Sequence, residues 1–515
     1  NEIERMLTPV ALSIGLDERE TANSITSGTN AGEGAPLDVI DDLAPPRPPA
    51  TKGDDTPPPP DLLPYAAADE GNAQAFMVLH GDSYLYTNEL GWLYYNGKYW
   101  AARGGNELLN RAIVDTLIER RTQAVTADLE PIVKVTRASA NNVRNCKYML
   151  QSLLWESIDN FDNDPDLLNC NNGVVNLKTG NLTPHSAGQR FTYCISTSYD
   201  RDADYSKWEQ WLFDCVTPEG TDDGDGKYAR LVCWLQAAFG YSLTGHTNEQ
   251  CMFYIQGPPR AGKGLLLQTF NDLIRSPLST FVQFDSFIQK RGGDNQNFDL
   301  AGLKPCRLLM ASESGDRQIL NAQRVKTITG DDDVRCAHKG KDFFSYRPVY
   351  KIWLSSNFKV KAQADDAGLW SRLRIIHFPN SYENREDYNL RKKLWAGKAG
   401  VLNWAVDGAI AWNKSLEKGK GLGRPKIIQD AIQEHRDEND TVAQFKEDRC
   451  FEGEEAYSVG AQLSLAYREW CTENGGTALG GRRFGEALRS KGFVYKGKKI
   501  SGKNVKCWHG IGLNL

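Results

Sequence analysis

The sequence has no run of about 18 apolar residues, no C-x-x-C pair and no methionine at its start. A membrane-spanning helix needs about 20 consecutive apolar residues, so no segment is expected to cross a membrane. The first residues are polar and do not resemble a signal peptide. The 11 cysteines stand singly and in odd number, which argues against a disulfide framework. These absences predict a cytoplasmic protein, with Cys233, Cys251 and Cys306 buried and reduced because they lie in apolar runs.

The chain also lacks an excess of positive charge, since its formal net charge is −5. A polyanionic partner would therefore have to bind local basic patches rather than the field of the whole protein. The length of 515 residues allows about three domains.

Little hydrophobic periodicity is present before Asp69, and prolines cluster between Pro45 and Pro60. We predict that residues 1–68 form an extended linker. Ordered structure is expected from Asp69, with a helix at 71–80 followed by aromatic strands at 84–100. These aromatic side chains are candidates for base stacking, but core packing is the favoured interpretation.

The stretch Gly257-Pro258-Pro259-Arg260-Ala261-Gly262-Lys263-Gly264 separates a predicted buried strand from a predicted helix that begins at Leu265. Strand, glycine-rich loop, lysine and helix is the arrangement that holds nucleotide phosphates. Two glycines let the loop turn tightly and aim backbone N–H groups at an anion, and the helix N-terminus adds partial positive charge. We therefore assign ATP binding to residues 257–265, with Lys263 as the cation for the β- and γ-phosphates.

This loop lacks the serine or threonine that normally follows the lysine and whose hydroxyl binds Mg²⁺. Gly264 stands there instead. Its backbone can still bind phosphate, but the metal loses one protein ligand. Either another oxygen or a water takes that place, or hydrolysis is weakened.

Two later apolar segments end in polar residues that suit ATP hydrolysis. Residues 307–312 lead into Glu313, which is expected to polarise the attacking water or to bind Mg²⁺. Residues 349–356 lead into Asn357, whose amide could hold the γ-phosphate or the lytic water. Strands of an α/β sheet deliver such residues to one crevice beside the loop.

Two arginines, Arg372 and Arg374, precede and begin a fourth apolar segment. A guanidinium can span the oxygens of a γ-phosphate and stabilise charge in the transition state. Taken alone, the pair would be interpreted as surface ion pairs. The preceding motifs favour a role in catalysis.

In this order and spacing the motifs resemble the superfamily 3 helicase core of phage, plasmid and poxvirus-type primase-helicases. Segment 69–100 resembles the domain that precedes the helicase in those proteins, so the resemblance covers about residues 69–515. The core motifs are Gly257–Gly264, Ala311-Ser312-Glu313, Thr329-Gly330-Asp331-Asp332, Trp353-Leu354-Ser355-Ser356-Asn357 and Trp370-Ser371-Arg372-Leu373.

The resemblance implies an AAA+-like ATPase that forms a ring, commonly a hexamer, and translocates 3′-to-5′ on single-stranded DNA at a fork. It implies ATP and Mg²⁺ as cofactors, and single-stranded and forked DNA and further copies of the chain as partners. Lys263 would be the phosphate lysine, Glu313 the catalytic acid and metal ligand, and Asn357 the sensor. Arg372, or alternatively Arg374, would reach the neighbouring subunit's nucleotide. The family often has two acids at the second motif, whereas Ser314 follows Glu313 here and weakens a second metal position.

Between Glu313 and Asn357, residues 335–344 resemble the hairpin that projects into the channel of such rings and grips DNA. His338, Lys339 and Lys341 would contact phosphates, with Phe343 or Phe344 bracing the hairpin. A solvated β-turn is the alternative interpretation.

The last part of the chain is locally basic, because residues 482–506 contain nine lysines and arginines and one acid, Glu486. The order helix, strand, glycine turn, strand resembles a winged helix, with a helix for the groove and a basic hairpin for the backbone. We predict DNA contacts from Arg482, Arg483, Lys498 and Lys499. A solubilising tail is the alternative.

These observations together predict an α/β protein, with an AAA+-like P-loop ATPase core, an N-terminal α+β adaptor domain and a C-terminal winged-helix domain. The predicted boundaries are 69–204 for the adaptor, 205–425 for the ATPase with its helical collar, and 426–515 for the winged helix. The predicted function is an ATP-dependent replicative DNA helicase of a virus or plasmid, acting in the host cytoplasm.

Three competing functions remain open. The first is an AAA+-like DNA-remodelling or packaging ATPase that does not unwind DNA. The second is a DNA-binding scaffold whose ATPase site is weakened at Gly264 and Ser314. The third and weakest is a small-molecule kinase, which would not need the basic tail. No clustered acids of a primase site precede residue 69 in a foldable segment, so a primase or polymerase domain is expected upstream of Asn1 if the protein has one.

Overall fold

The computed structural model describes residues 59–288, 303, 305–312, 319–330, 333–337, 343–362, 364, 366–474, 478–501 and 503–514, with only the backbone for 285, 335–337 and 343–344. The chain divides into two compact units, which meet at Ile158 and Asp159. The sequence analysis placed this boundary near residue 204. Within the described residues, no helix has the length and apolar character needed to cross a membrane.

Residues 159–204 belong to the second unit because its buried core holds them by hydrogen bonds. Gly245 N donates to Pro165 O at 2.8 Å. Thr197 Oγ1 donates to Leu273 O at 3.2 Å, and Asn403 Nδ2 donates to Arg201 O at 2.8 Å. These contacts join positions up to about 200 residues apart, so local sequence patterns do not reveal them.

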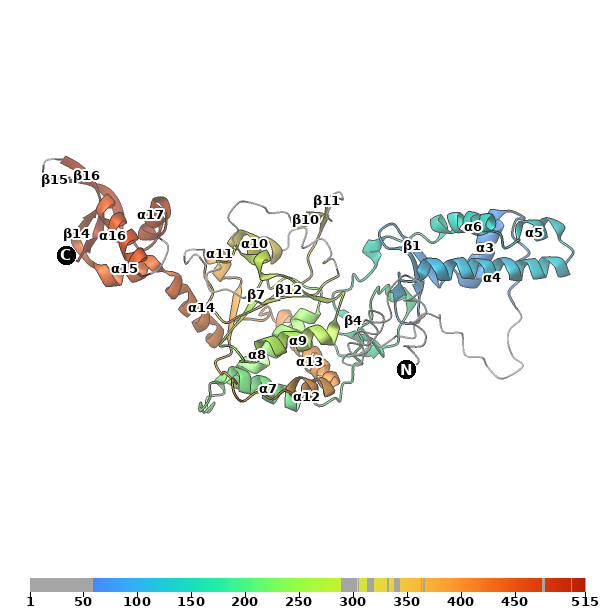
Figure 1. Cartoon of the computed structure of the whole chain (residues 1–515), viewed down its shortest axis with the longest axis horizontal. Helices are drawn as coiled ribbons and strands as arrows, with labels where there is room; N and C mark the ends of the chain where they lie inside the picture. The colour runs from blue at the N-terminus through green and yellow to red at the C-terminus, as the bar shows by residue number, and fades with distance from the viewer. Residues whose placement is uncertain are drawn as a thin grey trace, which may run out of the picture. The chain divides into compact units, whose positions relative to one another are not determined.

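From residue 59 onward, the N-terminal unit combines four α-helices with a small antiparallel sheet (Figure 1). Its elements are α3 (Asp69–His80), β1 (Tyr84–Thr87), β2 (Gly91–Tyr95), β3 (Trp100–Ala101), α4 (Gly105–Thr126), α5 (Glu130–Val135) and α6 (Ala140–Leu153). Tyr84, Trp92, Tyr94 and Trp100 of the sheet are buried against the helices. Core packing, rather than base stacking, is therefore confirmed for these aromatic side chains.

This unit begins earlier than the predicted start at Asp69, because Leu62 is fully buried. Residues 1–58 of the predicted linker lie outside the described residues. A buried arginine on α4 holds the incoming segment. The guanidinium of Arg120 donates to Leu62 O at 3.1 Å, Tyr65 O at 2.6 Å, Ala66 O at 2.8 Å and Asn72 Oδ1 at 2.7 Å.

The second unit holds a five-stranded sheet in the order β13-β7-β12-β9-β8, in which every neighbouring pair is parallel. Its strands are β7 (Met252–Gln256), β8 (Ser279–Phe281), β9 (Leu308–Ser312), β12 (Lys351–Ser356) and β13 (Leu373–His377). All five carboxyl ends therefore lie at one edge of the sheet. A mixed α/β fold with a parallel sheet confirms the predicted fold class at this level.

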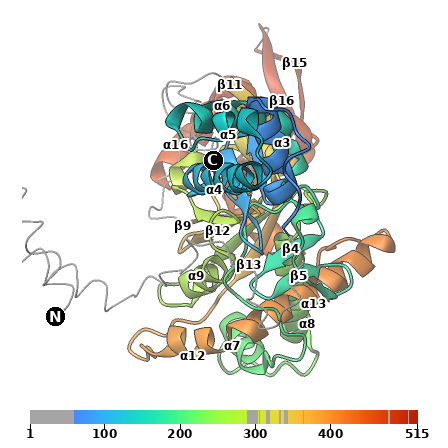
Figure 2. The same cartoon turned by 90° about the vertical axis from the view of Figure 1, so that its right-hand side faces the viewer.

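Helices cover both faces of this sheet (Figures 1 and 2). The helices of this part of the chain are α7 (Ser206–Val216), α8 (Lys227–Leu243), α9 (Lys263–Ile274), α10 (Ala322–Ile328), α11 (Ala367–Trp370), α12 (Leu390–Ala396), α13 (Lys398–Glu417) and α14 (Lys426–Asn439). Met252 and Tyr254 of β7 face a core shared with α10 and α11. The alternate residue Phe253 faces the other side, where it stacks on Trp353 at 4.1 Å. The alternation of a β-strand thus feeds two separate cores.

On this second face, aromatic rings stack from the sheet into the helices. Trp353 stacks on Phe239 of α8 at 4.0 Å, and Phe239 stacks on Phe270 of α9 at 3.7 Å. Behind them α8 meets α13 at backbone contact. A Cβ on Gly240 would lie 1.9 Å from Ala409 N, so only glycine permits this approach.

Buried basic residues line the amino ends of the strands. Arg307 Nη1 donates to Leu243 O at 2.7 Å, and Lys351 Nζ donates to Val349 O at 2.9 Å and to Thr244 O. Both therefore lie at the C-terminus of α8, whose carbonyl groups carry partial negative charge. Burial and the nearby Arg307 hold the pKa of Lys351 well below its usual value.

Smaller sheets complete the unit. β4 (Leu167–Cys170), β5 (Gly173–Asn176) and β6 (Leu182–Thr183) form an antiparallel sheet, and β10 (Val334–Ala337) pairs with β11 (Phe343–Tyr346). The last part runs α15 (Thr441–Arg449), β14 (Cys450–Val459), α16 (Gly460–Glu473), α17 (Gly481–Ser490), β15 (Val494–Ile500) and β16 (Lys503–Leu513). Its strands form an antiparallel sheet in the order β14-β16-β15.

The cysteines support a partial correction. Cys251 and Cys306 are buried as predicted, and burial raises the pKa of each thiol to about 12. Cys233 is exposed, so the prediction for it was wrong. It lies on α8 between Val232 and Trp234, which are both buried, and the helix turns the intervening side chain outward.

Replacing Arg120 by methionine should loosen the N-terminal unit. The change leaves buried carbonyl groups without donors, and each such group costs about 1–3 kcal/mol. We expect amide hydrogens of α4 and of residues 59–66 to exchange at least tenfold faster, measured by hydrogen exchange with mass spectrometry. Arg121→Met is the matched control, because Arg121 has one hydrogen bond, to Val133 O at 3.1 Å. Equal protection in the two variants would contradict the role of Arg120.

Candidate nucleotide-binding site

The loop between β7 and α9 has a backbone suited to an anion. Gly262 precedes α9 with φ of 91°, and Arg260 also has a positive φ, of 61°. Pro258 and Pro259 have no N–H group, so the donors of this loop come from Arg260 onward. When successive backbone N–H groups point to one side and a helix begins directly after them, they form a concave site that can bind a phosphate.

The loop needs glycine at positions 257 and 262, for different reasons. A Cβ on Gly257 would lie 2.0 Å from Phe378 O, so the backbone after β13 excludes any side chain there. A Cβ on Gly262 would approach Cys215 Sγ at 3.1 Å and Trp211 at 3.3 Å, in addition to the strain of its positive φ. Helix α7 and the end of β13 therefore support the loop from behind.

Lys263 is folded into this loop and contacts the next strand. Its Nζ donates to Gly257 O at 2.8 Å, Pro258 O at 2.7 Å and Asn357 Oδ1 at 2.9 Å. Burial lowers the pKa of Lys263 to about 8. No described carboxylate pairs with this ammonium group. The lysine is thus held by neutral acceptors, which leaves its charge available for an anionic ligand.

The carboxyl edge of the sheet brings two of the predicted residues together. Asn357 follows β12, which pairs with β7, and so lies beside the loop at the end of the adjacent strand. On the other side of β12, Ser355 Oγ lies 2.9 Å from Ser312 Oγ, the last residue of β9. Glu313, the predicted acid and metal ligand, comes next in the chain and lies outside the described residues.

Gly264 occupies the first turn of α9, and a Cβ there would meet no atom within 4 Å. The missing hydroxyl is therefore not excluded by packing. No group of three or more His, Cys, Asp or Glu residues that could hold a metal is found in the described part of the chain. The described loop supplies phosphate donors, and the side-chain oxygens that contact it include Asn357 Oδ1 and Ser381 Oγ, which donates to Pro259 O at 3.0 Å.

Arg372 and Arg374 lie at the opposite edge of the sheet. Met252 N, at the start of β7, donates to Arg372 O at 2.8 Å, whereas Phe378 N donates to Gln256 O at the end that leads into the loop. Five residues of strand separate the two ends, roughly 13 Å. Neither arginine is therefore positioned to contact a nucleotide bound by the loop of its own chain.

The two arginines differ in accessibility. Arg374 is only 4% exposed and donates to Ser371 O and Leu373 O, both at 3.0 Å. Arg372 is half-buried and donates to Gly368 O at 3.1 Å. The Nε atoms of both are buried without a partner among the described residues. Of the two, Arg372 has the guanidinium that a neighbouring molecule can reach.

Helix α14 holds the segment that follows Asn357. His435 Nδ1 accepts from Val360 N at 3.2 Å, and Asn439 bonds Val360 O at 2.8 Å and Ala362 N at 3.0 Å. Lys359 pairs with Glu434 at 2.6 Å and with Glu438. Burial lowers the pKa of His435 to about 4, so its ring is neutral and can accept this bond. These residues were absent from the sequence-based candidates.

The predicted DNA contacts are only partly described. Strands β10 and β11 form the predicted hairpin in register from Val334↔Tyr346 to Ala337↔Phe343. His338, Lys339 and Lys341 lie outside the described residues, as do the side chains of Phe343 and Phe344.

In the C-terminal part, Arg482 and Arg483 are exposed on α17. Lys499 is exposed on β15, and Lys498 Nζ lies 3.4 Å from the centre of the Tyr457 ring. Cation–π contact of this kind keeps the ammonium group near the surface of the sheet.

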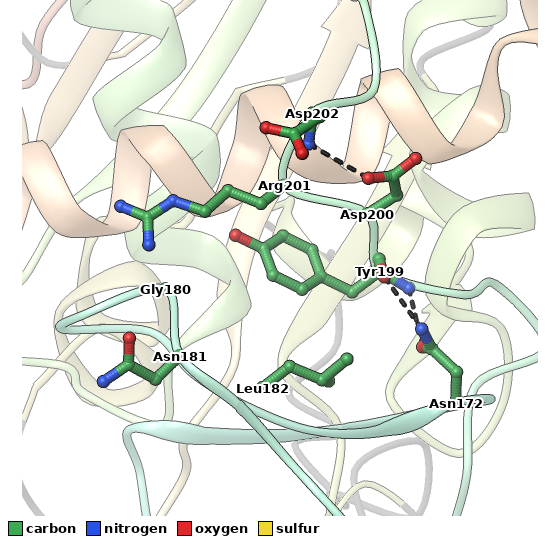
Figure 3. A pocket seen from close by; sticks show the side chains of 8 residues that line it. All are labelled: Asn172, Gly180, Asn181, Leu182, Tyr199, Asp200, Arg201 and Asp202. Carbon is green, nitrogen blue, oxygen red and sulfur yellow. Dashed lines mark hydrogen bonds between the residues drawn. The ribbon is translucent and has the colours of Figure 1, made fainter.

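A separate polar pocket of about 560 Å³ lies in residues 172–202 (Figure 3). It is lined by Asn172, Gly180, Asn181, Leu182, Tyr199, Asp200, Arg201 and Asp202. Its side chains largely bond within the same segment, because the Asn172 amide contacts Tyr199 N and O and Asp200 accepts from Asp202 N. None of the lining residues belongs to the phosphate-type loop, so the pocket is not the candidate site.

Three family models match the chain. One described as D5 N terminal like matches residues 73–217, and one described as a family of unknown function (DUF5906) matches 255–372. The third, described as Poxvirus D5 protein-like, matches 437–513. The first match crosses the boundary between the two compact units, and the second begins at the end of β7.

Among curated proteins, a putative helicase, L207/L206, of Acanthamoeba polyphaga mimivirus is 21% identical over 338 residues. The match covers 61% of this chain and 34% of that protein, so the chain spans about a third of the length of this relative.

Two solved structures of the NrS-1 C-terminal region align over 66% and 63% of this chain and 92% and 81% of theirs, at 11% and 10% identity. Their TM-score of 0.36 is too low to establish a shared fold. The family evidence is therefore the D5-type models at both ends of the chain and the helicase-named viral relative. These similarities support a primase-helicase family of the D5 type.

Proposed function

We propose that this protein is the ATP-driven helicase part of a viral or plasmid primase-helicase, which moves along single-stranded DNA as a ring of identical subunits. The observation that carries the proposal is the three-way contact of Lys263 Nζ with Gly257 O, Pro258 O and Asn357 Oδ1. It joins a glycine-rich loop to the adjacent strand end, where a γ-phosphate sensor belongs in a P-loop ATPase.

In this proposal the loop N–H groups and Lys263 bind the phosphates of ATP. A γ-phosphate would replace the loop carbonyls as the partner of the ammonium group, because a charged acceptor binds it more strongly. Asn357 would then report the presence of that phosphate by keeping or losing its contact with Lys263. Glu313 is assigned the polarisation of the attacking water.

Mg²⁺ would neutralise charge on the β- and γ-phosphates. The described residues offer it few oxygens, since Gly264 has no side chain. We assign the protein side of this site to Glu313, with the hydroxyl groups of Ser312 and Ser355 at the ends of the adjacent strands. Waters and the nucleotide itself would complete the coordination, as is usual for this ion.

The position of Arg372 supports assembly into a ring, for which we propose a hexamer. A guanidinium at the amino edge of the sheet is remote from its own loop and open to a neighbour. In a closed ring of head-to-tail subunits, one edge of each copy meets the opposite edge of the next. Arg372 would then complete the nucleotide site of the adjacent subunit.

DNA binding is assigned to the β10–β11 hairpin and to the C-terminal part. The order α15, β14, α16, α17, β15, β16 supports a winged helix, in which α17 would enter a groove and the β15–β16 hairpin would contact the backbone. Arg482 and Arg483 are the proposed groove contacts, and Lys498 and Lys499 the proposed backbone contacts.

A DNA-binding scaffold with a weakened ATPase is the second candidate function. Gly264 is the observation that favours it, because the usual metal-binding hydroxyl is missing from an otherwise complete loop. DNA binding without any ATP turnover by the wild-type chain would support the scaffold.

The first test compares ATP hydrolysis by wild type, Lys263→Ala and Arg372→Ala, with and without single-stranded DNA. We expect DNA to stimulate the wild type, Lys263→Ala to lose nucleotide binding, and Arg372→Ala to retain binding while hydrolysis falls about 10³-fold or more. Mixing the two inactive variants should restore part of the activity, because some interfaces then combine an intact loop with an intact arginine.

Arg374→Ala is the comparison for that test. Since Arg374 is buried, its loss should destabilise the fold, and mixing with Lys263→Ala should not restore activity. Recovery with Arg374→Ala instead of Arg372→Ala would reverse the assignment. Absence of recovery with either would remove the proposed arginine in trans.

Restoring a hydroxyl at Gly264 should strengthen metal use. Gly264→Ser places a side chain where no atom lies within 4 Å of the new Cβ, so the loop should tolerate it. We expect half-maximal ATPase activity at a several-fold lower Mg²⁺ concentration than in wild type. Gly264→Ala is the matched control, because it adds the Cβ without the oxygen. Identical Mg²⁺ titrations of the serine and alanine variants would show that the hydroxyl does not reach the metal.

Nucleotide binding should weaken as the pH rises above about 8. At pH values below the pKa of Lys263, its amine is already protonated in the nucleotide-free protein. At pH values above that pKa, binding of phosphate must draw a proton onto the amine. The affinity for ADP should then fall by up to about tenfold per pH unit. Calorimetry at pH 9 in two buffers of different ionisation enthalpy should detect the uptake of close to one proton. Lys263→Arg should abolish that uptake. An affinity for ADP that stays the same from pH 7 to pH 9.5 would contradict the lowered pKa of Lys263.

A further inference from the structure

Helix α6 of the N-terminal unit exposes large apolar side chains. Tyr148 is 74% exposed, Met149 41% and Leu153 53%, and Trp155 just beyond the helix is 54% exposed. The helix packs on the unit through Cys146 and Leu150 on its other side. Clustered exposed apolar groups of this kind mark an interaction site.

The helical spacing places Tyr148 on the same face of α6 as a cation. Arg144, Tyr148 and Ser152 are four residues apart and therefore share one face of α6. Trp155 follows at a fixed place, because Tyr86 N donates to Leu154 O and Glu156 N donates to Tyr86 O, both at 2.8 Å. We name Arg144, Tyr148, Met149, Leu153 and Trp155 the α6 patch.

The sequence around the patch carries positive charge only. From residue 131 to residue 155 there is no Asp or Glu, whereas Lys134, Arg137, Arg144 and Lys147 are all present. Arg144 contacts the neutral Asn141, and Lys147 contacts Asn106 and Asn110. Neither side chain is hydrogen-bonded to a carboxylate among the described residues. Burial lowers the pKa of Lys147 while the nearby Glu107 raises it, and Lys134 pairs with Glu130 at 3.9 Å, so Arg144 is the cation of the patch that remains for a ligand. In a chain of net charge −5 this local excess favours an anionic partner.

We propose that the α6 patch is a binding site for single-stranded DNA, separate from the basic tail. Unpaired bases have free faces that stack on Tyr148 and Trp155, and their phosphates would pair with Arg144. Duplex DNA has no free base faces. A second copy of the patch would bring like charges together, so a symmetric contact between copies is disfavoured. The proposal shares its ligand with the proposed helicase function but does not depend on ATP hydrolysis.

The test measures binding of a bromodeoxyuridine-containing oligonucleotide to the full chain, followed by photocrosslinking and peptide mapping. The double change Tyr148→Ala and Trp155→Ala is introduced into two backgrounds, the wild-type chain and the tail variant Lys498→Ala/Lys499→Ala. We expect the α6 changes to weaken binding of single strands about 5- to 100-fold in the tail-variant background and to remove the crosslink to the peptide that contains Tyr148. Duplex binding should be unchanged.

Two controls separate stacking from loss of structure. Tyr148→Phe with Trp155→Phe keeps the rings and should retain most of the affinity. Tyr388→Ala removes a tyrosine that is 91% exposed elsewhere and should have no effect. Unchanged binding in the α6 alanine variant would overturn the proposal, as would a change of oligomeric state with DNA affinity intact, which would identify a contact between copies. If the tail variant alone bound DNA as tightly as wild type, the result would count against the winged-helix assignment and not against the patch.

Discussion

The parallel direction of the five-stranded sheet is the constraint on which the candidate site depends. Because all strands run the same way, the ends of β7, β9 and β12 meet at one edge, and their starts meet at the other. The loop, Lys263 and Asn357 are close together for this reason, although about 94 residues separate the last two. The same constraint sends Arg372 to the far edge, and so a nucleotide site built from both edges requires two copies of the chain.

The amino edge shows how this arrangement tolerates buried charge. Arg307 and Lys351 use the carbonyl groups at the C-terminus of α8, and Arg374 uses the carbonyls of Ser371 and Leu373. Carbonyl dipoles satisfy donors without an acid, but they compensate the charge less than a carboxylate would, which is consistent with the lowered pKa of Lys351. Arg372 stands outside this buried group, and its single bond to Gly368 O restrains it less. At this edge, most basic side chains are thus held by buried carbonyl groups, whereas the guanidinium of Arg372 is accessible to a neighbouring molecule.

Helix α14 gives the segment that follows β12 a second attachment. His435 and Asn439 bind the backbone of residues 360–362 directly after Asn357, while His377 at the end of β13 bonds Gln256 at 2.7 Å and lies 5.4 Å from the His435 ring. Gln256 is the last residue before the loop. A displacement of Asn357 on nucleotide binding would therefore strain contacts with α14, whose end continues into α15 of the C-terminal part. Hydrogen bonds and the polypeptide itself thus connect residues 360–362 with α14 and α15.

Elements with local signals could be predicted from the sequence, and contacts between distant elements could not. Strand, glycine loop and helix at 252–274 follow from apolar runs and glycine, and the mixed α/β class follows from their alternation. Arg372 was predicted as the arginine in trans and Arg374 stayed open as the alternative. The sequence could not exclude Arg374, since the start of β13 at Leu373, which buries one and leaves the other in a turn, depends on pairing with β7. Arg120 and His435 were missed because they act through backbone carbonyl and N–H partners 54 to 75 residues away. For the sheet aromatics, core packing was the favoured interpretation and base stacking the alternative, and their burial confirms the first. The exposed rings of α6 had a local signal, a stretch of bases without acids, which charge patterning along the helix could have revealed.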